Sequence, residues 1–259
     1  FLKLLASLAV FVFFIPYSAA VFMGLSYLFR SNFGIDYTTA LALMGGFTAL
    51  YLVLGGYRSM AMIDVAFGMI MLVGVAILLG FTLHRAGGPA LLVEQLGAID
   101  PRLTAPVGPP GWWPLFCLVF LTSVAPLGMP QLVQKFYAIK DRRAIRVGTV
   151  ASSSFALLIG GVAYFTGAAS RLFLDPVTAP AAFTPQGVPV FDALMPELLA
   201  RVVPDSLAVL MLLLILSASM STLAALVLIS SSSVVKDLYA GFLAAGADDR
   251  TLTRLMRIA

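Results

Sequence analysis

The stretch that decides the fold runs from residue 207 to residue 239: "LAVLMLLLILSASMSTLAALVLISSSSVVKDLY". Residues 207–229 are apolar enough to lie in a bilayer, yet they include four hydroxyl side chains, and four consecutive serines follow. A hydrocarbon core about 30 Å thick needs roughly 20 mostly apolar residues for one helical crossing. We therefore expect a membrane-spanning helix whose hydroxyl groups have a specific purpose.

The composition of the whole chain is that of an integral membrane protein. Hydrophobic residues make up 61% of the 259 residues, charged residues make up 11%, and the mean hydropathy is +1.01. Such values are far outside the range of soluble domains of this length. We expect an all-α, polytopic helical bundle with six transmembrane helices. The expected spans are Leu4–Phe29, Tyr37–Tyr57, Ser59–Leu83, Trp113–Phe136, Val147–Phe173 and Ser206–Ile229, the last continuing toward Tyr239.

The positive charges indicate how these spans are oriented. If alternate connections face the same side, eleven of the 16 Lys and Arg residues share one side. These eleven are Lys3, Arg58, Lys135, Lys140, Arg142, Arg143, Arg146, Lys236, Arg250, Arg254 and Arg257; the other five are Arg30, Arg85, Arg102, Arg171 and Arg201. The positive-inside rule places the larger set in the cytoplasm. The net charge of +4 therefore reflects orientation, and we expect the lipid bilayer, not nucleic acid, as a partner.

The fourth expected span contains helix-breaking residues near its middle. Pro126, Gly128 and Pro130 lie within five positions of one another. Each proline removes a backbone donor, so the carbonyls between Thr122 and Pro126 should lose intrahelical partners. Discontinuous helices at this depth commonly form the substrate and ion sites of secondary transporters. The alternative is a simple proline kink that serves helix packing.

The sixth expected span places three oxygen atoms on one helical face. Ala218, Ser221 and Thr222 are spaced i, i+3 and i+4, which aligns a backbone carbonyl with two hydroxyls. Neutral oxygen ligands suit a small hard cation such as Na⁺ that must be bound and then released. The alternative is that these residues allow close helix approach and bond across a helix interface.

Residues typical of enzymes are missing from the sequence of the spans. There is one cysteine, Cys117, and one histidine, His84, so neither a disulfide nor a cysteine-histidine metal cluster is expected. The spans contain no His–carboxylate pair, Asp pair or Ser–His arrangement. We therefore do not expect an enzyme.

Four blocks of the sequence resemble the sodium:solute symporter family. They are "FFIPYSAA" at residues 13–20, "GGYRSMAMIDVAFGMIM" at 55–71, "PLGMPQLVQKFYAIKD" at 126–141 and "SASMSTLAALVLISSSSVVKDLY" at 217–239. The blocks follow the family's order and spacing over essentially the whole chain. The resemblance implies a fold of five plus five helices in an inverted repeat. Residues 1–259 would be a single transmembrane transporter domain, incomplete at both ends, that supplies roughly core helices three to eight.

The resemblance also implies where a sodium ion binds. The Ala218 carbonyl and the Ser221 and Thr222 hydroxyls match one half of the family's sodium site. Asp64 matches an acidic residue near the cytoplasmic start of a core helix. Asp64 would either tune cation coupling or pair with a basic neighbour such as Arg58, and the sequence leaves both possibilities open.

The resemblance further implies a substrate cavity. Tyr17 matches a position that lines or gates that cavity. The interrupted stretch from Thr122 to Pro130, called the hinge below, matches the broken helix that faces the substrate. The implied cavity residues are Tyr17, Thr122, Ser123, Pro126 and Pro130.

Some residues depart from the family pattern. Phe67 replaces a common Gln, and Met129 and Gln131 flank Pro130 where other residues are usual. The polar partners of a proline or sugar site are therefore not visible. The stretches "HRAGG…IDPRLTAP" and "KDLY" are similar to the family's sodium/pantothenate branch, which points to an organic acid or an amino-acid-like solute.

These observations together predict a function. We expect a sodium-coupled secondary transporter in the plasma membrane that imports a small organic solute by alternating access. The alternative is a transporter-like membrane sensor or interaction module that operates without flux.

Overall fold

The computed structural model describes residues 2–244 and 246–259, with the side chains of residues 27 and 30–33 left undescribed. The side chain of Arg30, counted above in the charge asymmetry, therefore lies outside the description. The chain is 84% helical, and the described residues contain no strand beyond one isolated bridge between Phe183 and Pro189. The all-α prediction is confirmed.

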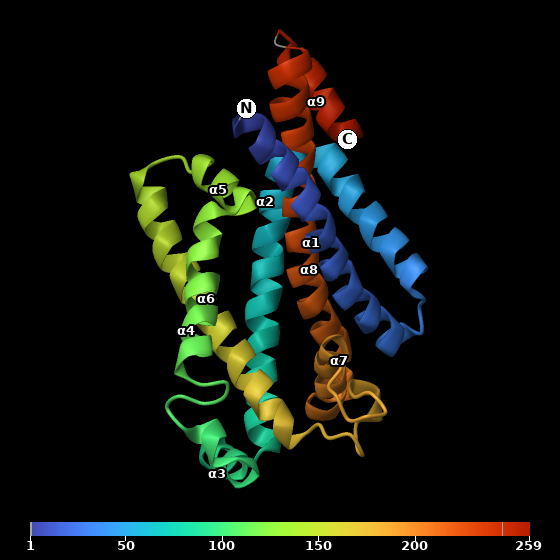
Figure 1. The fold of residues 1–259 in the computed structure, drawn as a ribbon. Coiled ribbons are helices and arrows are strands. Elements are labelled where there is room, and N and C mark those ends of the chain that lie inside the picture. The colour runs from blue at the N-terminus through green and yellow to red at the C-terminus, as the bar shows by residue number, and fades with distance from the viewer. Residues whose placement is uncertain (1, 245) are drawn as a thin grey trace. The chain divides into compact units, whose positions relative to one another are not determined.

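The helices follow one another along the chain (Figure 1). They are α1 (Leu2–Phe33), α2 (Tyr37–Arg85), α3 (Pro89–Ile99), α4 (Trp112–Val124), α5 (Pro130–Tyr137), α6 (Arg142–Ala169), α7 (Phe191–Val202), α8 (Ala208–Ser232) and α9 (Asp249–Ile258). Single 3₁₀ turns occupy Pro101–Thr104, Ala125–Gly128, Ser170–Leu172, Pro180–Ala182 and Asp205–Leu207, and a π-helix, η6, continues α8 over Ser233–Leu243.

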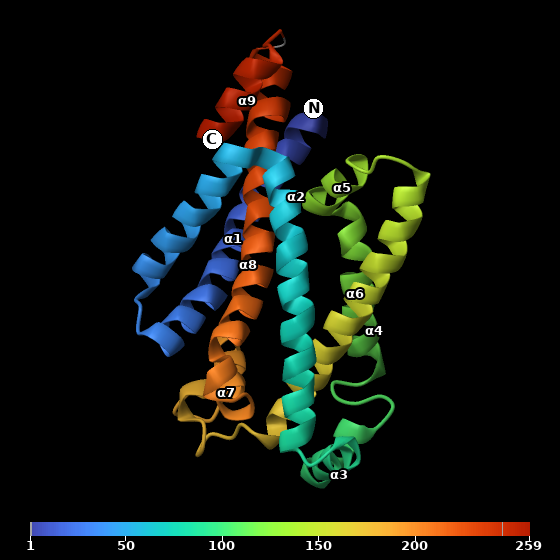
Figure 2. The same cartoon turned by 180° about the vertical axis from the view of Figure 1, so that it is seen from behind.

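The helix α2 reverses its direction at Gly56. This residue has φ 58° and ψ −150°, a conformation that only glycine adopts without strain. At the preceding residue, Gly55, a Cβ atom would collide with the side chain of Ser59. The Gly-Gly pair thus divides α2 into a first leg and a second leg, which turn back on each other at this point (Figures 1 and 2).

The number of membrane spans differs from the sequence-based expectation. Within the described residues, four helical segments are long and apolar enough to cross a membrane, or five if the bent pair Trp112–Gly128 and Pro130–Tyr137 forms one span. The difference arises because the two expected spans at Tyr37–Tyr57 and Ser59–Leu83 are joined in the 49-residue α2. A straight helix of that length would extend about 70 Å, more than twice the hydrocarbon thickness. The count of six spans stays a prediction.

The chain divides into two compact units, residues 1–68 with 215–259 and residues 69–214. In the first unit, α1 packs against η6, and the legs of α2 pack against α8. The buried residues at this second contact are Tyr51, Leu52, Met60, Met220, Ala224 and Ala225. Small alanines on α8 let the larger side chains of α2 approach closely, which is a common arrangement in membrane helix pairs.

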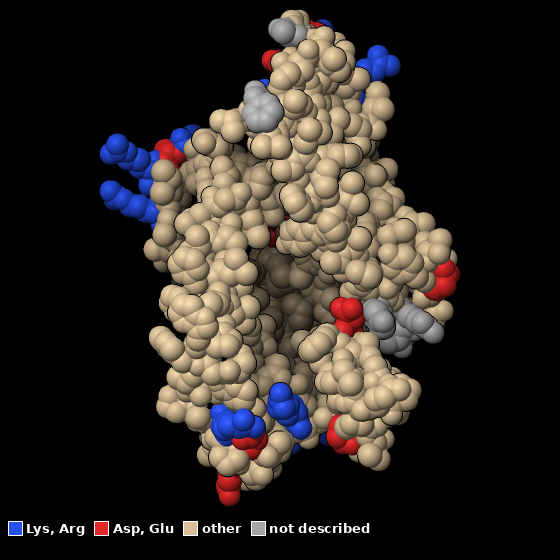
Figure 3. Space-filling model, viewed as in Figure 1, with Lys and Arg blue, Asp and Glu red and all other residues tan. Residues whose placement is uncertain are grey.

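The second unit contains α3 to α7. The end of α2, the helix α3 and the end of α6 share a small apolar core formed by Ala86, Leu92, Leu96 and Ala169. The two longest connections between the apolar helices contain the short helices α3 and α7. On the face seen in Figure 3, charged side chains gather over the α5–α6 connection and beside α3, while uncharged side chains cover α4 and α6 between them. Connections expected on opposite sides of the membrane therefore lie at opposite ends of this unit.

Candidate functional site

The turn from Ala218 to Thr222 in α8 carries the oxygens expected to bind a cation. The Thr222 hydroxyl donates a hydrogen bond of 3.1 Å to the Ala218 carbonyl. Ala218 is exposed, and Ser221 and Thr222 are half-buried. Because the Thr222 proton is committed to the carbonyl, the lone pairs of the hydroxyl remain available as acceptors.

Asp64, on the second leg of α2, lies directly beside this turn. The Ser221 hydroxyl donates a hydrogen bond of 2.8 Å to the Asp64 carboxylate Oδ1. Asp64 is half-buried, and both residues belong to the first unit. The bond directs the Ser221 proton toward the carboxylate, so the remaining lone pairs of the oxygen point elsewhere. The structure places Asp64 against Ser221, and both roles named for Asp64 stay predictions.

The chemistry of this arrangement suits an alkali cation better than a transition metal. Among the described residues, no group of three or more His, Cys, Asp or Glu side chains is placed to hold a metal ion. The turn offers neutral carbonyl and hydroxyl oxygens, and one carboxylate lies beside them. Hard oxygen ligands with a single nearby negative charge allow a monovalent cation to bind and to leave.

A second contact near the same turn was not expected from the sequence. The first leg of α2 contributes Tyr51, whose hydroxyl lies 3.5 Å from the Met220 carbonyl, and Thr48, whose hydroxyl lies 3.6 Å from the Met220 sulfur. All three residues are buried. The only signal in the sequence was two polar side chains within an apolar run, one helical turn apart.

The hinge expected in the fourth span is present in the second unit. The helix α4 ends at Val124, a 3₁₀ turn follows over Ala125–Gly128, and α5 begins at Pro130 at an angle of 50°. Met129 has extended backbone at the break. Both prolines act as expected, because Pro126 lies in the first turn of the 3₁₀ segment and Pro130 starts α5.

The polar residues of the hinge differ in their surroundings. Thr122 and Ser123 are exposed, and the Thr122 hydroxyl donates to the carbonyls of Leu118 and Val119. Pro126 and Pro130 are half-buried. Gln131, named in the sequence only as a departure from the family pattern, is buried, and its Oε1 has no hydrogen-bond partner within the described part of the chain.

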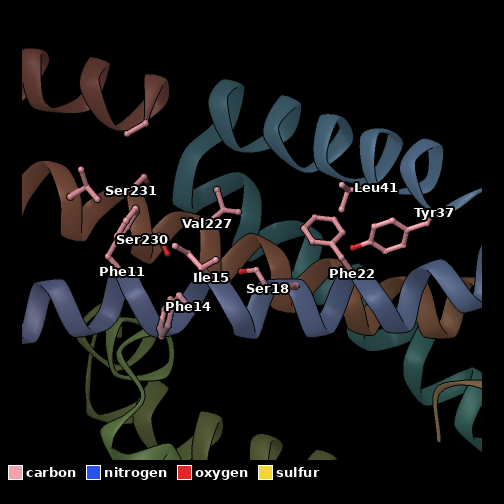
Figure 4. A pocket seen from close by; sticks show the side chains of 13 residues that line it. Phe11, Phe14, Ile15, Ser18, Phe22, Tyr37, Leu41, Val227, Ser230 and Ser231 are labelled. Atoms are coloured by element: carbon pink, nitrogen blue, oxygen red, sulfur yellow. The ribbon is translucent and has the colours of Figure 1, made fainter. Parts of the chain in front are cut away.

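Tyr17 lies on α1 and contacts a residue that lines a cavity in the first unit. The ring of Tyr17 packs edge-on against that of Phe14, with 6.5 Å between the ring centroids. Phe14 lines a cavity of about 720 Å³ between α1, the first leg of α2 and α8. Figure 4 shows Phe22 and Tyr37 at one end of this cavity and Phe11, Ser230 and Ser231 at the other.

The four serines after the apolar run have different partners. Ser230 and Ser231 line the cavity, and Ser231 donates to the Leu228 carbonyl. Ser233 is buried and donates to the Ser7 carbonyl on α1, over 3.4 Å. The serines therefore do not all face one site, as expected from four consecutive helical positions.

Charged groups outside the spans stabilise turns. Hydrogen bonds from Thr39 lower the pKa of Asp36, the residue that precedes α2. The Arg102 side chain lowers the pKa of Asp100 through a hydrogen bond of 2.8 Å. Hydrogen bonds from Thr178 lower the pKa of Asp175. Asp36 and Asp175 are exposed and Asp100 is half-buried, and all three hold local turns separate from the turn at Ser221.

Comparisons with known proteins agree with this geometry. A family model described as "Sodium:solute symporter family" matches residues 1–259. The sodium/pantothenate symporter of Haemophilus influenzae is 31% identical over 248 residues, which cover 92% of this chain and 48% of that protein. A high-affinity proline transporter of Bacillus subtilis is 28% identical over 273 residues, covering 100% of this chain and 53% of that protein. The chain spans about half the length of these curated relatives.

A solved structure shares the fold. It is the substrate-bound, outward-open state of a Na⁺-coupled sialic acid symporter, with 17% identity and a TM-score of 0.81 over 98% of this chain and 54% of the other. The likeness extends over both units and includes the broken α4–α5 segment, because almost the whole chain is covered. The match of the family model over every residue shows that the chain belongs to the sodium:solute symporter family.

Proposed function

We propose that the protein imports a small organic solute together with Na⁺ by alternating access. Members of its family are multi-pass plasma-membrane symporters and not enzymes. The observation that carries the proposal is the hydrogen bond between Ser221 and Asp64, which joins the expected cation-binding turn to an acidic residue within a membrane-length helix. Ionisable residues at such positions are costly and usually functional. A sensor without flux has no comparable support, because the relatives are symporters.

The Na⁺ ion is bound by the Ala218 carbonyl and the Ser221 and Thr222 hydroxyls. Asp64 acts in coupling: a cation on the Ser221 oxygen lies within about 5 Å of the carboxylate, and at an effective dielectric constant near 20 their attraction amounts to roughly 3 kcal/mol. This attraction offsets part of the cost of removing the ion from water. Further ligands come from parts of the transporter core outside residues 1–259.

The membrane potential and the Na⁺ gradient together drive the uptake. Moving one positive charge inward releases about 2.3 kcal/mol per 100 mV. Binding of Na⁺ favours the outward-open state, and the solute then closes the cavity. The cycle requires only that the outward-open state binds Na⁺ more tightly than the inward-open state.

The solute is contacted by Tyr17 and by the hinge residues Thr122, Ser123, Pro126 and Pro130. The break in the fourth span supports this assignment, since interrupted helices expose backbone groups that solutes can bind. The names of the similar proteins include pantothenate, proline and sialic acid, all of which carry a carboxylate. A small carboxylate-bearing solute is therefore the class that we propose. The two units described above act within one transporter domain of the five-plus-five inverted-repeat type.

Uptake into proteoliposomes by the complete protein tests the proposal. We expect accumulation of radiolabelled pantothenate or proline when an inward Na⁺ gradient is imposed. This accumulation should increase when valinomycin is used to make the vesicle interior electrically negative as well. An inward K⁺ gradient in place of Na⁺ is the matched control. Equal uptake of every tested carboxylate with and without Na⁺ would contradict sodium coupling.

A further inference from the structure

The two legs of α2 contact consecutive residues of α8. From the first leg, Tyr51 and Thr48 reach the carbonyl and the sulfur of Met220. From the second leg, Asp64 accepts the hydrogen bond from Ser221. The chain reversal at Gly56 brings both legs to the same turn of α8.

The contact at Met220 lies in a dry part of the first unit. Tyr51 is 9% exposed, Thr48 is 2% exposed and Met220 is 3% exposed. A hydroxyl in such surroundings needs an acceptor, because leaving it without one is more costly than the bond itself is worth. A helical carbonyl has a second lone pair and can accept a hydroxyl in addition to its own helical partner.

The geometry of the α-helix gives the two contacts different tasks. Residues 220 and 221 are about 100° apart around the helix axis and about 1.5 Å apart along it. A single polar contact restrains α8 at one point and still allows rotation about the helix axis. Two contacts from different directions restrain both the rotation of α8 about its axis and its translation along that axis.

We propose that Tyr51 is a positioning residue for the cation-binding turn of α8. Its hydroxyl holds the Met220 carbonyl and thereby sets the direction in which the oxygens of Ala218, Ser221 and Thr222 point. This inference rests on the sodium site proposed above, and it adds a residue that touches neither the ion nor the solute.

The hydroxyl of Tyr51 can be tested apart from its ring. The ring packs edge-on against Phe47, with 5.6 Å between the centroids, and Phe47 is 53% exposed. Tyr51→Phe keeps that contact and removes only the hydroxyl. Phe47→Leu removes the aromatic contact and keeps the hydroxyl, so it is the matched control.

The experiment measures solute uptake against Na⁺ concentration with the complete protein in proteoliposomes. For Tyr51→Phe we expect the half-saturating Na⁺ concentration to rise about 2- to 10-fold, because the variant loses one hydrogen bond to the cation-binding turn. The maximal rate and the KM for solute, both at saturating Na⁺, should change less than about twofold, because the positioned groups bind the ion. Phe47→Leu should leave the Na⁺ curve unchanged.

Three further results separate the possible failures. A wild-type protein without Na⁺ dependence would overturn the proposed function itself. A raised half-saturating Na⁺ concentration in Ser221→Ala, with an unchanged curve in Tyr51→Phe, would leave the ion site in place and overturn the role of Tyr51. If Tyr51→Phe is not recovered folded, Tyr51→Leu removes the same hydroxyl, and Phe47→Leu accounts separately for the lost ring contact. The half-saturating Na⁺ concentration of Tyr51→Leu should rise about 2- to 10-fold, and an unchanged value overturns the inference.

Discussion

The Ser221 hydroxyl and the Asp64 carboxylate are 2.8 Å apart although 157 positions separate them in the sequence. The bond links α8 to the second leg of α2 within the first unit. It places a negative charge beside a hydroxyl whose own neighbours, Ala218 and Thr222, are also joined by a hydrogen bond. A cation that binds this turn therefore interacts with a carboxylate through one intervening oxygen.

Changing Ser221 to Ala should weaken Na⁺ binding. The variant loses one ion ligand and removes the hydrogen bond from Ser221 to the Asp64 carboxylate, so we expect the half-saturating Na⁺ concentration for uptake to rise about tenfold. Asp64→Asn keeps an acceptor for Ser221 but removes the charge, and we expect a rise of tenfold or more. Uptake titrated with Na⁺ gives both values.

The two changes should not be additive. Because the side chains are in direct contact, the double variant is expected to raise the half-saturating concentration by less than the product of the single effects. Additive effects would mean that Asp64 influences the ion independently of Ser221. Unchanged Na⁺ curves in both single variants would mean that this turn serves helix packing and does not bind the ion.

Thr222 should respond differently to two conservative changes. Thr222→Val preserves the shape of the side chain and removes the hydroxyl that donates to the Ala218 carbonyl. Because the ion loses one oxygen ligand, the half-saturating Na⁺ concentration should rise several-fold. Thr222→Ser retains the hydroxyl and should stay within about twofold of wild type. A Val variant that behaves like the Ser variant would remove Thr222 from the ion site.

Replacing both hinge prolines should slow the transport cycle. With Pro126→Ala and Pro130→Ala, the segment that now bends by 50° can form regular helical hydrogen bonds. We expect a lower maximal uptake rate with near-normal protein yield. Pro16→Ala, at the proline inside α1, is the control, since α1 is continuous there. An unchanged turnover in the double variant would show that the break serves only the architecture.

Gly56→Ala should destabilise the fold through the backbone. A Cβ atom at this position meets no neighbour, yet the φ of 58° with ψ −150° is strained for alanine by about 1–3 kcal/mol. We expect a lower yield of monodisperse protein and a lower midpoint in thermal denaturation followed by gel filtration. Gly46→Ala, in an ordinary helical stretch of α2 that also has free space, should leave the midpoint unchanged or raise it. Equal midpoints for the two variants would contradict the assignment of the strain.

Local features of the sequence were enough to predict much of this protein. Long apolar runs predict helices because a bilayer leaves each backbone group to be satisfied within its own segment. The two prolines at 126 and 130 predict the break in the fourth span, because a proline effect acts on its immediate neighbours. The i, i+3, i+4 spacing of Ala218, Ser221 and Thr222 predicts a shared face, and the Thr222 hydroxyl bonds to the Ala218 carbonyl.

Contacts between distant segments were decided only by the tertiary structure. The sequence left two roles open for Asp64 and did not predict its bond to Ser221, which depends on the chain reversal at Gly56 and on the packing of α2 against α8. The contact of Tyr51 with Met220 left no pattern in the sequence, because one hydroxyl in an apolar run looks the same whatever carbonyl it faces. Periodicity shows which face of a helix a residue occupies, whereas the partner of that face depends on the packing of whole helices.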